Sequence, residues 1–131
     1  MNTDMNVKLN SHGVNKLIKA TILSDKEMRD IGFTDYSKDN WYFCRMIKFP
    51  NIKRYHGLDI SFNVIIPKDN SDIQIDVLDE ALCQPYDYQY MLDKNPKRFE
   101  PCLIVKEQVE EWMKYLQDKG VLSGHVYGEY I

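Results

Sequence analysis

The sequence lacks the features that mark several common classes of protein. Its three cysteines lie 39 and 19 residues apart, whereas zinc sites take closely spaced ligands and secreted disulfide frameworks take an even number. No apolar run approaches the roughly 20 residues of a membrane helix, and Met1–Asn10 has no stretch typical of a signal peptide. We therefore expect a cytoplasmic protein with three reduced thiols, no metal site and no membrane segment.

Clustered glycine is scarce as well. The six glycines are spread along the chain, and the patterns GxGxxG, GxxxxGK[ST], HExxH and GxSxG are all missing. A loop that cradles phosphate needs glycines close together, because its backbone N–H groups must approach the ligand. The sequence therefore predicts no cofactor and no catalytic residue, and it favours a protein that is not an enzyme without deciding the question.

The two halves of the 131-residue chain differ in net charge. Residues 1–65 hold 10 basic and 7 acidic side chains, a balance of +3, and residues 66–131 hold 7 basic and 13 acidic ones, a balance of −6. The basic residues are scattered, whereas a nucleic-acid-binding protein gathers them on one face to neutralise phosphates. We expect no nucleic-acid ligand. The acidic half instead indicates a protein partner with a basic surface, because opposite potentials steer encounter.

Hydrophobic periodicity predicts about four antiparallel strands. Leu58–Pro67 and Asp72–Leu78 alternate apolar and polar residues on either side of a polar turn, which is typical of a β-hairpin. Asn15–Leu23 alternates in the same way. Trp41–Phe49 is apolar on both faces, so we expect it at the centre of the sheet, with Cys44 as a small core residue.

One long helix is predicted over residues 105–119. Its apolar residues recur at helical spacing and form a single stripe: Val105, Val109, Trp112, Met113 and Leu116. Ser24 and Glu27 form a capping-box pattern for a short helix over 25–31, and a second short helix is favoured over a strand for 85–93. The expected fold is therefore α+β, with the long helix packed on one face of the sheet. Residues 1–13 are expected to be a flexible arm and residues 14–131 a single domain.

Two features of the chain indicate a surface for a partner. One face of the predicted hairpin is polar and is expected to meet water or a partner; its residues are Asp59, Ser61, Asn63, Gln74 and Asp76. Three tyrosines within five residues cannot all enter a small core, and exposed tyrosine beside acid is common in binding surfaces. The predicted partner-binding residues are Asp76, Asp79, Glu80, Tyr86, Asp87, Tyr88 and Tyr90.

Two alternatives remain open at this point. The first is a binding protein for a small, nucleotide-like ligand, or a small enzyme, with a pocket near Gly124–Gly128. Its ligand-binding residues would be Arg54, His56, His125 and Tyr127. The second is a homo-oligomer, in which another copy of the chain covers the exposed aromatic residues of Trp41–Phe49.

The amino-acid usage is biased toward 13 lysines against 4 arginines, 12 isoleucines, 9 asparagines and 9 tyrosines. Together with the short chain, the lone acidic α+β domain and the missing enzyme motifs, this bias resembles small uncharacterised proteins of phages and mobile elements from low-GC Gram-positive bacteria. The resemblance covers the whole chain and implies a protein that binds and blocks a host protein. The targets of such proteins include host defence complexes, as for anti-CRISPR proteins. The chain is then expected to occupy a nucleic-acid site of its target. The resemblance assigns no role to individual residues.

Overall fold

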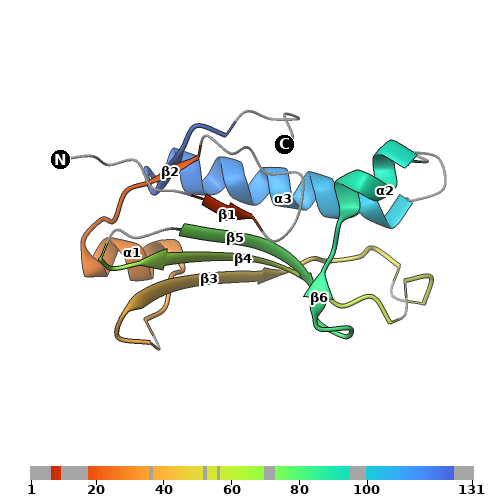
Figure 1. The fold of residues 1–131 in the computed structure, drawn as a ribbon, viewed down its shortest axis with the longest axis horizontal. Helices are drawn as coiled ribbons and strands as arrows, with labels where there is room; N and C mark the ends of the chain where they lie inside the picture. Colours follow the sequence, from red (N-terminus) through yellow and green to blue (C-terminus); the bar gives the residue numbers. More distant parts are fainter. Residues whose placement is uncertain are drawn as a thin grey trace.

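The computed structural model of the chain describes residues 7–9, 18–35, 37–51, 53–55, 57–69, 73–94 and 100–125. In chain order, its elements are β1 (Val7–Leu9), β2 (Lys19–Ala20), α1 (Asp25–Ile31), β3 (Asn40–Met46), β4 (Ile60–Pro67), β5 (Ile73–Asp79), β6 (Gln84–Pro85), α2 (Tyr88–Lys94), α3 (Glu100–Asp118) and β7 (Leu122–Ser123). Figure 1 shows the long helix α3 lying across one face of the main sheet.

The main sheet is built on three antiparallel strands in the order β5-β4-β3. On the other side of β5, β6 pairs antiparallel to it and β1 pairs parallel to it. Strands β2 and β7 form a separate antiparallel pair. The expected α+β architecture, with an antiparallel sheet and a long C-terminal helix, is confirmed. β1 lies inside the segment expected to be an arm, and the rest of residues 1–13 falls outside the described residues.

The core fills the space between the sheet and α3. Alternate residues of β4 and β5 are fully buried on this side: Ile60, Phe62, Val64, Ile66, Ile73, Ile75 and Val77. They share one buried cluster with four residues of the predicted helical stripe: Val105, Val109, Met113 and Leu116. Burying one such side chain contributes about 1.5–3 kcal/mol, so this layer holds the hairpin and the helix together.

The helices begin and end for local reasons. In α1, the Ser24 hydroxyl accepts a hydrogen bond from Glu27 N–H, as the capping-box pattern predicted. α3 begins at Glu100 rather than at residue 105. Pro101 is tolerated there because the first turn of a helix has N–H groups without intrahelical acceptors. α3 ends at Asp118, and Gly120 then adopts a φ of 82°, which favours glycine.

β3 lies at the edge of the sheet, and the expectation of a central strand was wrong. Trp41 and Phe43 point into the core, whereas Cys44 and Met46 are exposed on the opposite face. The strand looked apolar on both faces because its outward residues are apolar as well, although no second layer formed by the described residues covers them. Cys44 is therefore a surface thiol and not a core residue.

Other parts of the chain occupy both ends of the β3 edge. Thr34 and Tyr42 exchange two backbone hydrogen bonds of 2.8 Å near the start of the strand. Just after its end, the Gln108 carboxamide of α3 accepts from Lys48 N–H (2.8 Å) and donates to the Lys48 carbonyl (2.6 Å). One side chain of α3 thus takes the place of a peptide group in a neighbouring strand. Covering an edge in this way protects it from pairing with other chains.

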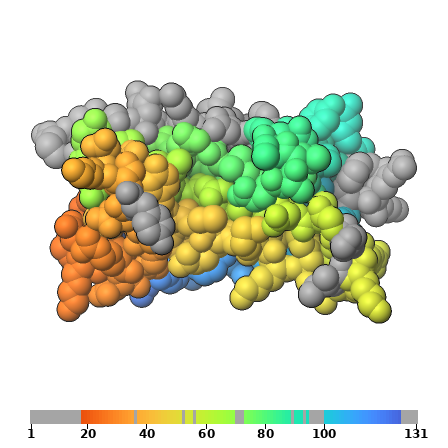
Figure 2. Space-filling view, turned by 90° about the horizontal axis from the view of Figure 1, so that it is seen from below, coloured from red at the N-terminus to blue at the C-terminus, as the bar shows by residue number. Residues whose placement is uncertain are grey.

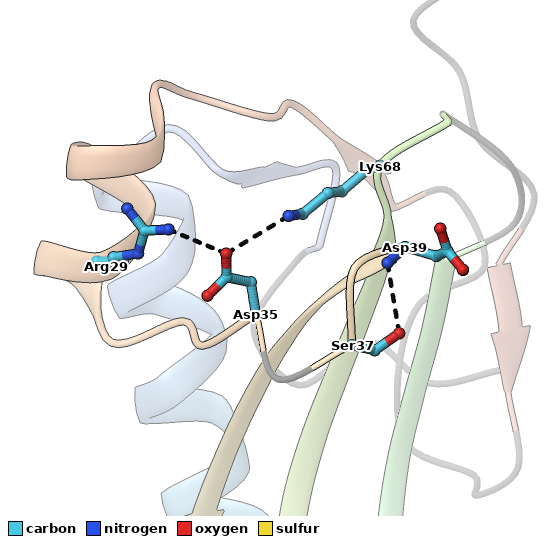
Figure 3. Close-up of polar contacts among 5 residues, drawn as sticks. All are labelled: Arg29, Asp35, Ser37, Asp39 and Lys68. Carbon is cyan, nitrogen blue, oxygen red and sulfur yellow. Dashed lines mark hydrogen bonds and ion pairs between the residues drawn. The ribbon is translucent and has the colours of Figure 1, made fainter.

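The turn that leads into β3 is held by the carboxylate of Asp35 (Figure 3). Its Oδ2 atom lies 2.9 Å from Nη2 of Arg29 on α1 and 3.5 Å from Nζ of Lys68, just after β4. Both cations also lie over the ring of Trp41, 5.6 and 4.6 Å from its centroid. The hydrogen bond from Arg29, together with the charges of both cations, lowers the pKa of Asp35.

Candidate functional site

The face of the sheet opposite α3 is not covered by any helix of the described residues. We call it the outer face; its strand residues are Tyr42, Cys44, Met46, Ser61, Asn63, Ile65, Gln74, Asp76 and Leu78. Figure 2 looks at this face, where β3, β4 and β5 are open to view and α3 is visible only at the lower rim. Antiparallel sheets tolerate burial on one side only, so an open second face is free to meet a partner.

Polar side chains in the middle of the outer face bond to one another instead of to water alone. Asn63 Nδ2 donates to Ser61 Oγ (2.8 Å), and Ser61 Oγ donates to Oε1 of Glu80 (2.5 Å). Gln74 Nε2 donates to Oδ2 of Asp76 (2.5 Å). Ser61 and Asp76 were expected to be exposed, but they are 0 % and 3 % exposed. The expectation failed for these two residues because alternation along a strand tells which face a side chain is on, but not whether it is covered there.

The turn between β5 and β6 forms a raised border beside the outer face. Asp79 Oδ1 accepts from Leu82 N–H (3.1 Å), and Glu80 N–H donates to the carbonyl of Asp59 (2.8 Å). Leu82 is 64 % exposed at this turn. Cys83 has a φ of 52°, in the left-handed region that non-glycine residues rarely adopt. The apolar side chain is therefore presented to solvent by a turn of defined geometry.

A hollow of about 430 Å³ lies between this turn and the end of β5. We call it the β6 hollow; its lining residues are Leu78, Asp79, Glu80, Cys83, Gln84 and Pro85. Leu78 and Pro85 are register partners in β5 and β6 and supply apolar wall, whereas Asp79 and Glu80 supply carboxylates. The hollow thus combines apolar surface with negative charge.

The predicted tyrosine segment does not form one surface. Tyr88 is fully buried, and burial followed by the charge of Glu110 raises its pKa. Tyr86 is half-buried, and its hydroxyl lies 3.4 Å from Sγ of Cys102. Tyr90 is exposed on α2, as one tyrosine of the three was expected to be. The helix favoured for this segment is confirmed over Tyr88–Lys94.

The acidic residues predicted with these tyrosines also differ in burial. Glu80 is exposed. Asp76 and Asp79 are buried, so the expectation that they present their charge at an open surface was wrong. Asp87 is half-buried, and its Oδ1 accepts from Tyr90 N–H (3.1 Å) at the start of α2. Of the predicted partner-binding residues, Glu80 and Tyr90 are therefore the two with exposed side chains.

The residues of the ligand-binding alternative are not brought together within the described part of the chain. Arg54 Nη2 lies 2.6 Å from Oε2 of Glu100, at the start of α3. His125 Nε2 lies 2.7 Å from Oε2 of Glu110, ten residues further along the same helix. That separation is about 15 Å at 1.5 Å per residue. His56 and Tyr127 lie outside the described residues.

His125 docks the segment after β7 along α3. Its side chain is 2 % exposed and that of Glu110 is 1 % exposed. The backbone N–H of His125 also donates to Oε1 of Gln117 (3.0 Å). Leu122–Ser123 therefore pair as a strand, and His125 packs along the helix.

A second hollow, of about 640 Å³, lies between the β3 edge and α3. Its lining residues are Arg45, Met46, Lys48, Glu107, Gln108, Glu111 and Trp112. The Arg45 guanidinium lies over the rings of Phe43 and Trp112, 4.2 and 5.1 Å from their centroids. Two cations and two carboxylates balance here, so this hollow has no net charge with which to select a partner. No pattern in the sequence indicates this hollow, because its residues come from distant segments.

Comparisons of the chain with protein families, curated proteins and solved structures find no match. Across the described ranges, no three His, Cys, Asp or Glu side chains are grouped as ligands for a metal ion. Within the same ranges, no helix has the length and apolar character needed to cross a membrane. The outer face with the β6 hollow is thus the candidate site that the geometry supports best.

Proposed function

We propose that the chain is a non-enzymatic protein-binding module that docks a partner with a basic surface on the outer face of its sheet. The observation that carries this proposal is an open sheet face and an adjoining turn, which together expose apolar side chains beside the carboxylate of Glu80. Met46 and Leu82 are 46 % and 64 % exposed, and apolar groups of this kind supply binding energy when a partner covers them.

Charge complementarity supports the choice of partner. Glu80 is the exposed carboxylate beside the outer face, Asp79 lies buried next to it, and the described residues of the outer face and the β5–β6 turn include no lysine or arginine. A negative surface speeds encounter with a positive one and disfavours acidic partners. Proteins that hold nucleic acid are basic where they contact phosphate. The resemblance to small phage proteins adds a cytoplasmic host protein as partner, and an acidic face docked on its nucleic-acid site would block it.

The test compares matched variants on immobilised protein. We expect a host protein to be retained at low salt by the wild type and released at high salt. Leu82→Ser and Glu80→Lys should abolish retention. Leu103→Ser is the matched control, because Leu103 is 42 % exposed on α3, away from the outer face. Equal retention by all variants, or no partner at either salt concentration, would contradict the proposal.

Light scattering adds a second readout. We expect the purified chain to be a monomer, with its outer face free. A dimer that Leu82→Ser or Glu80→Lys disrupts would assign the face to a second copy of this chain and would overturn the proposal of a different, basic partner.

A further inference from the structure

We infer that the β6 hollow receives an arginine side chain of the docked partner, with its guanidinium group on Glu80 and Asp79. This inference rests on the proposed function, because it names the chemistry that the outer face recognises. The volume of about 430 Å³ lies within the roughly 300–1,000 Å³ of pockets that hold small ligands, so one long side chain has room.

The walls of the hollow match the two parts of such a side chain. Leu78 and Pro85 offer apolar surface to the methylene stem, since long basic side chains bury their stems against apolar groups. The charged head then reaches the carboxylates of Asp79 and Glu80. No ion pair joins either carboxylate to a cation within the described part of the chain.

The carboxylate of Glu80 is held in place before any partner arrives. Its Oε1 atom accepts from the buried hydroxyl of Ser61, which in turn accepts from Asn63 Nδ2. The Glu80 backbone is fixed by its bond to the Asp59 carbonyl. Among the described contacts none engages Oε2 of Glu80. A pre-oriented group loses less conformational entropy on binding.

Asp79 supplies the second carboxylate of the hollow. This residue is 7 % exposed and lines the hollow. Its Oδ1 accepts from Leu82 N–H, and among the described contacts none engages Oδ2. A guanidinium offers five donors in a planar fork, so it can serve two carboxylates at once, whereas an ammonium is a compact point charge with three.

The test uses blocked amino acids and the intact chain. N-acetylarginine methylamide is titrated while amide NMR signals of Leu82, Cys83 and Gln84 are followed. We expect saturable shifts at these amides, weaker ones with the lysine analogue, and none with the neutral citrulline analogue. Glu80→Gln should weaken arginine binding about tenfold or more, the loss typical of one charge-assisted hydrogen bond. Ser61→Ala should weaken it by a smaller factor.

The control is Glu107→Gln, which removes the same charge beside the other hollow. It should leave the titration unchanged. The inference is overturned by the absence of saturable shifts, by equal shifts with citrulline, or by an equal loss in Glu107→Gln. If arginine binds here but no partner docks on the outer face, the proposed function fails and the arginine site stands. If docking depends on Leu82 but Glu80→Gln leaves it unchanged, the arginine site fails and the proposed function stands.

Discussion

The Asp35 carboxylate predicts a pH-dependent contribution to stability. Its pKa in the fold is below the ordinary value of 3.8, first because Arg29 donates to it. A carboxylate of this kind stabilises the fold above its ordinary pKa, and the contribution is lost as the pH falls through the folded value. We expect Asp35→Asn to lower the Tm at pH 7 and to leave it unchanged near pH 2. Thermal melts at both pH values measure this.

Asp30→Asn is the control for Asp35, because Asp30 is exposed on α1 and forms no ion pair among the described residues. It should have little effect at either pH. A loss in Asp35→Asn that is equally large near pH 2 would show that the side chain acts through packing and not through its charge.

The buried pair of Glu110 and His125 predicts strongly non-additive mutations. His125→Leu leaves a buried carboxylate without its partner, which costs about 3–5 kcal/mol of the free energy of unfolding. Glu110→Leu combined with His125→Leu removes both polar groups and should recover most of that loss. Urea denaturation of the single and double variants measures the coupling.

Glu111→Leu provides the matched control for this pair, because Glu111 is exposed next to Glu110. It should change stability by less than about 0.5 kcal/mol. A double variant as unstable as the sum of its single variants would disagree with the buried pair.

The environments of the three tyrosines could be predicted only in part from the sequence. Tyr86, Tyr88 and Tyr90 are spaced by two, which is also the period of a strand. In the fold Tyr88 and Tyr90 lie on α2 and Tyr86 just before it. Residues two apart on a helix point about 200° apart, so Tyr88 enters the core while Tyr90 faces solvent. The excess of aromatic residues was visible in the sequence, but their separate environments depend on where the helix packs.

At the scale of elements, the contact between α3 and the β3 edge predicts that the Lys48 amide is protected from hydrogen exchange. Gln108→Ala removes both hydrogen bonds to Lys48, each worth about 0.5–1.5 kcal/mol net. We expect lower stability and faster hydrogen exchange at the Lys48 amide. Gln108→Glu keeps the acceptor for that amide but loses the donor to the carbonyl. Its stability and its exchange rate at the Lys48 amide should therefore lie between those of the wild type and Gln108→Ala.

The neighbouring variant Glu107→Ala is the control, since Glu107 is exposed on the same turn of α3 and its side chain has no described bond to β3. An unchanged exchange rate at the Lys48 amide in Gln108→Ala would show that the carboxamide does not protect this edge.

The elements themselves were largely predictable from the sequence. The hairpin of β4 and β5, the α3 stripe and the capped α1 follow from alternation, helical spacing and one capping box. What failed was the placement of β3, because apolar residues on both faces indicate either a central strand or an open face awaiting a partner. Local periodicity cannot separate these cases, since the answer depends on whether another layer is present.

At the scale of the whole molecule, the sheet has one covered and one open face (Figure 1). The sequence predicted that division from the polar side of the hairpin. It did not predict the β6 hollow, whose walls come from the end of β5, a short turn and β6. Leu82, an apolar residue between the predicted strand 72–78 and the predicted helix 85–93, is a signal that could have indicated it. The bonds among Ser61, Asn63 and Glu80 require knowledge of the strand register.

The exposed thiol of Cys83 allows the native chain to be labelled beside this face. Partial burial and the charge of Glu80 raise the pKa of Cys44, so at neutral pH little of it is the reactive thiolate, while Cys102 is buried. Cys83, at the lip of the hollow, is exposed. A fluorophore coupled there through a maleimide would sit beside the docking face of the native chain. A change in its emission would then report, in real time, that a partner has bound to this face.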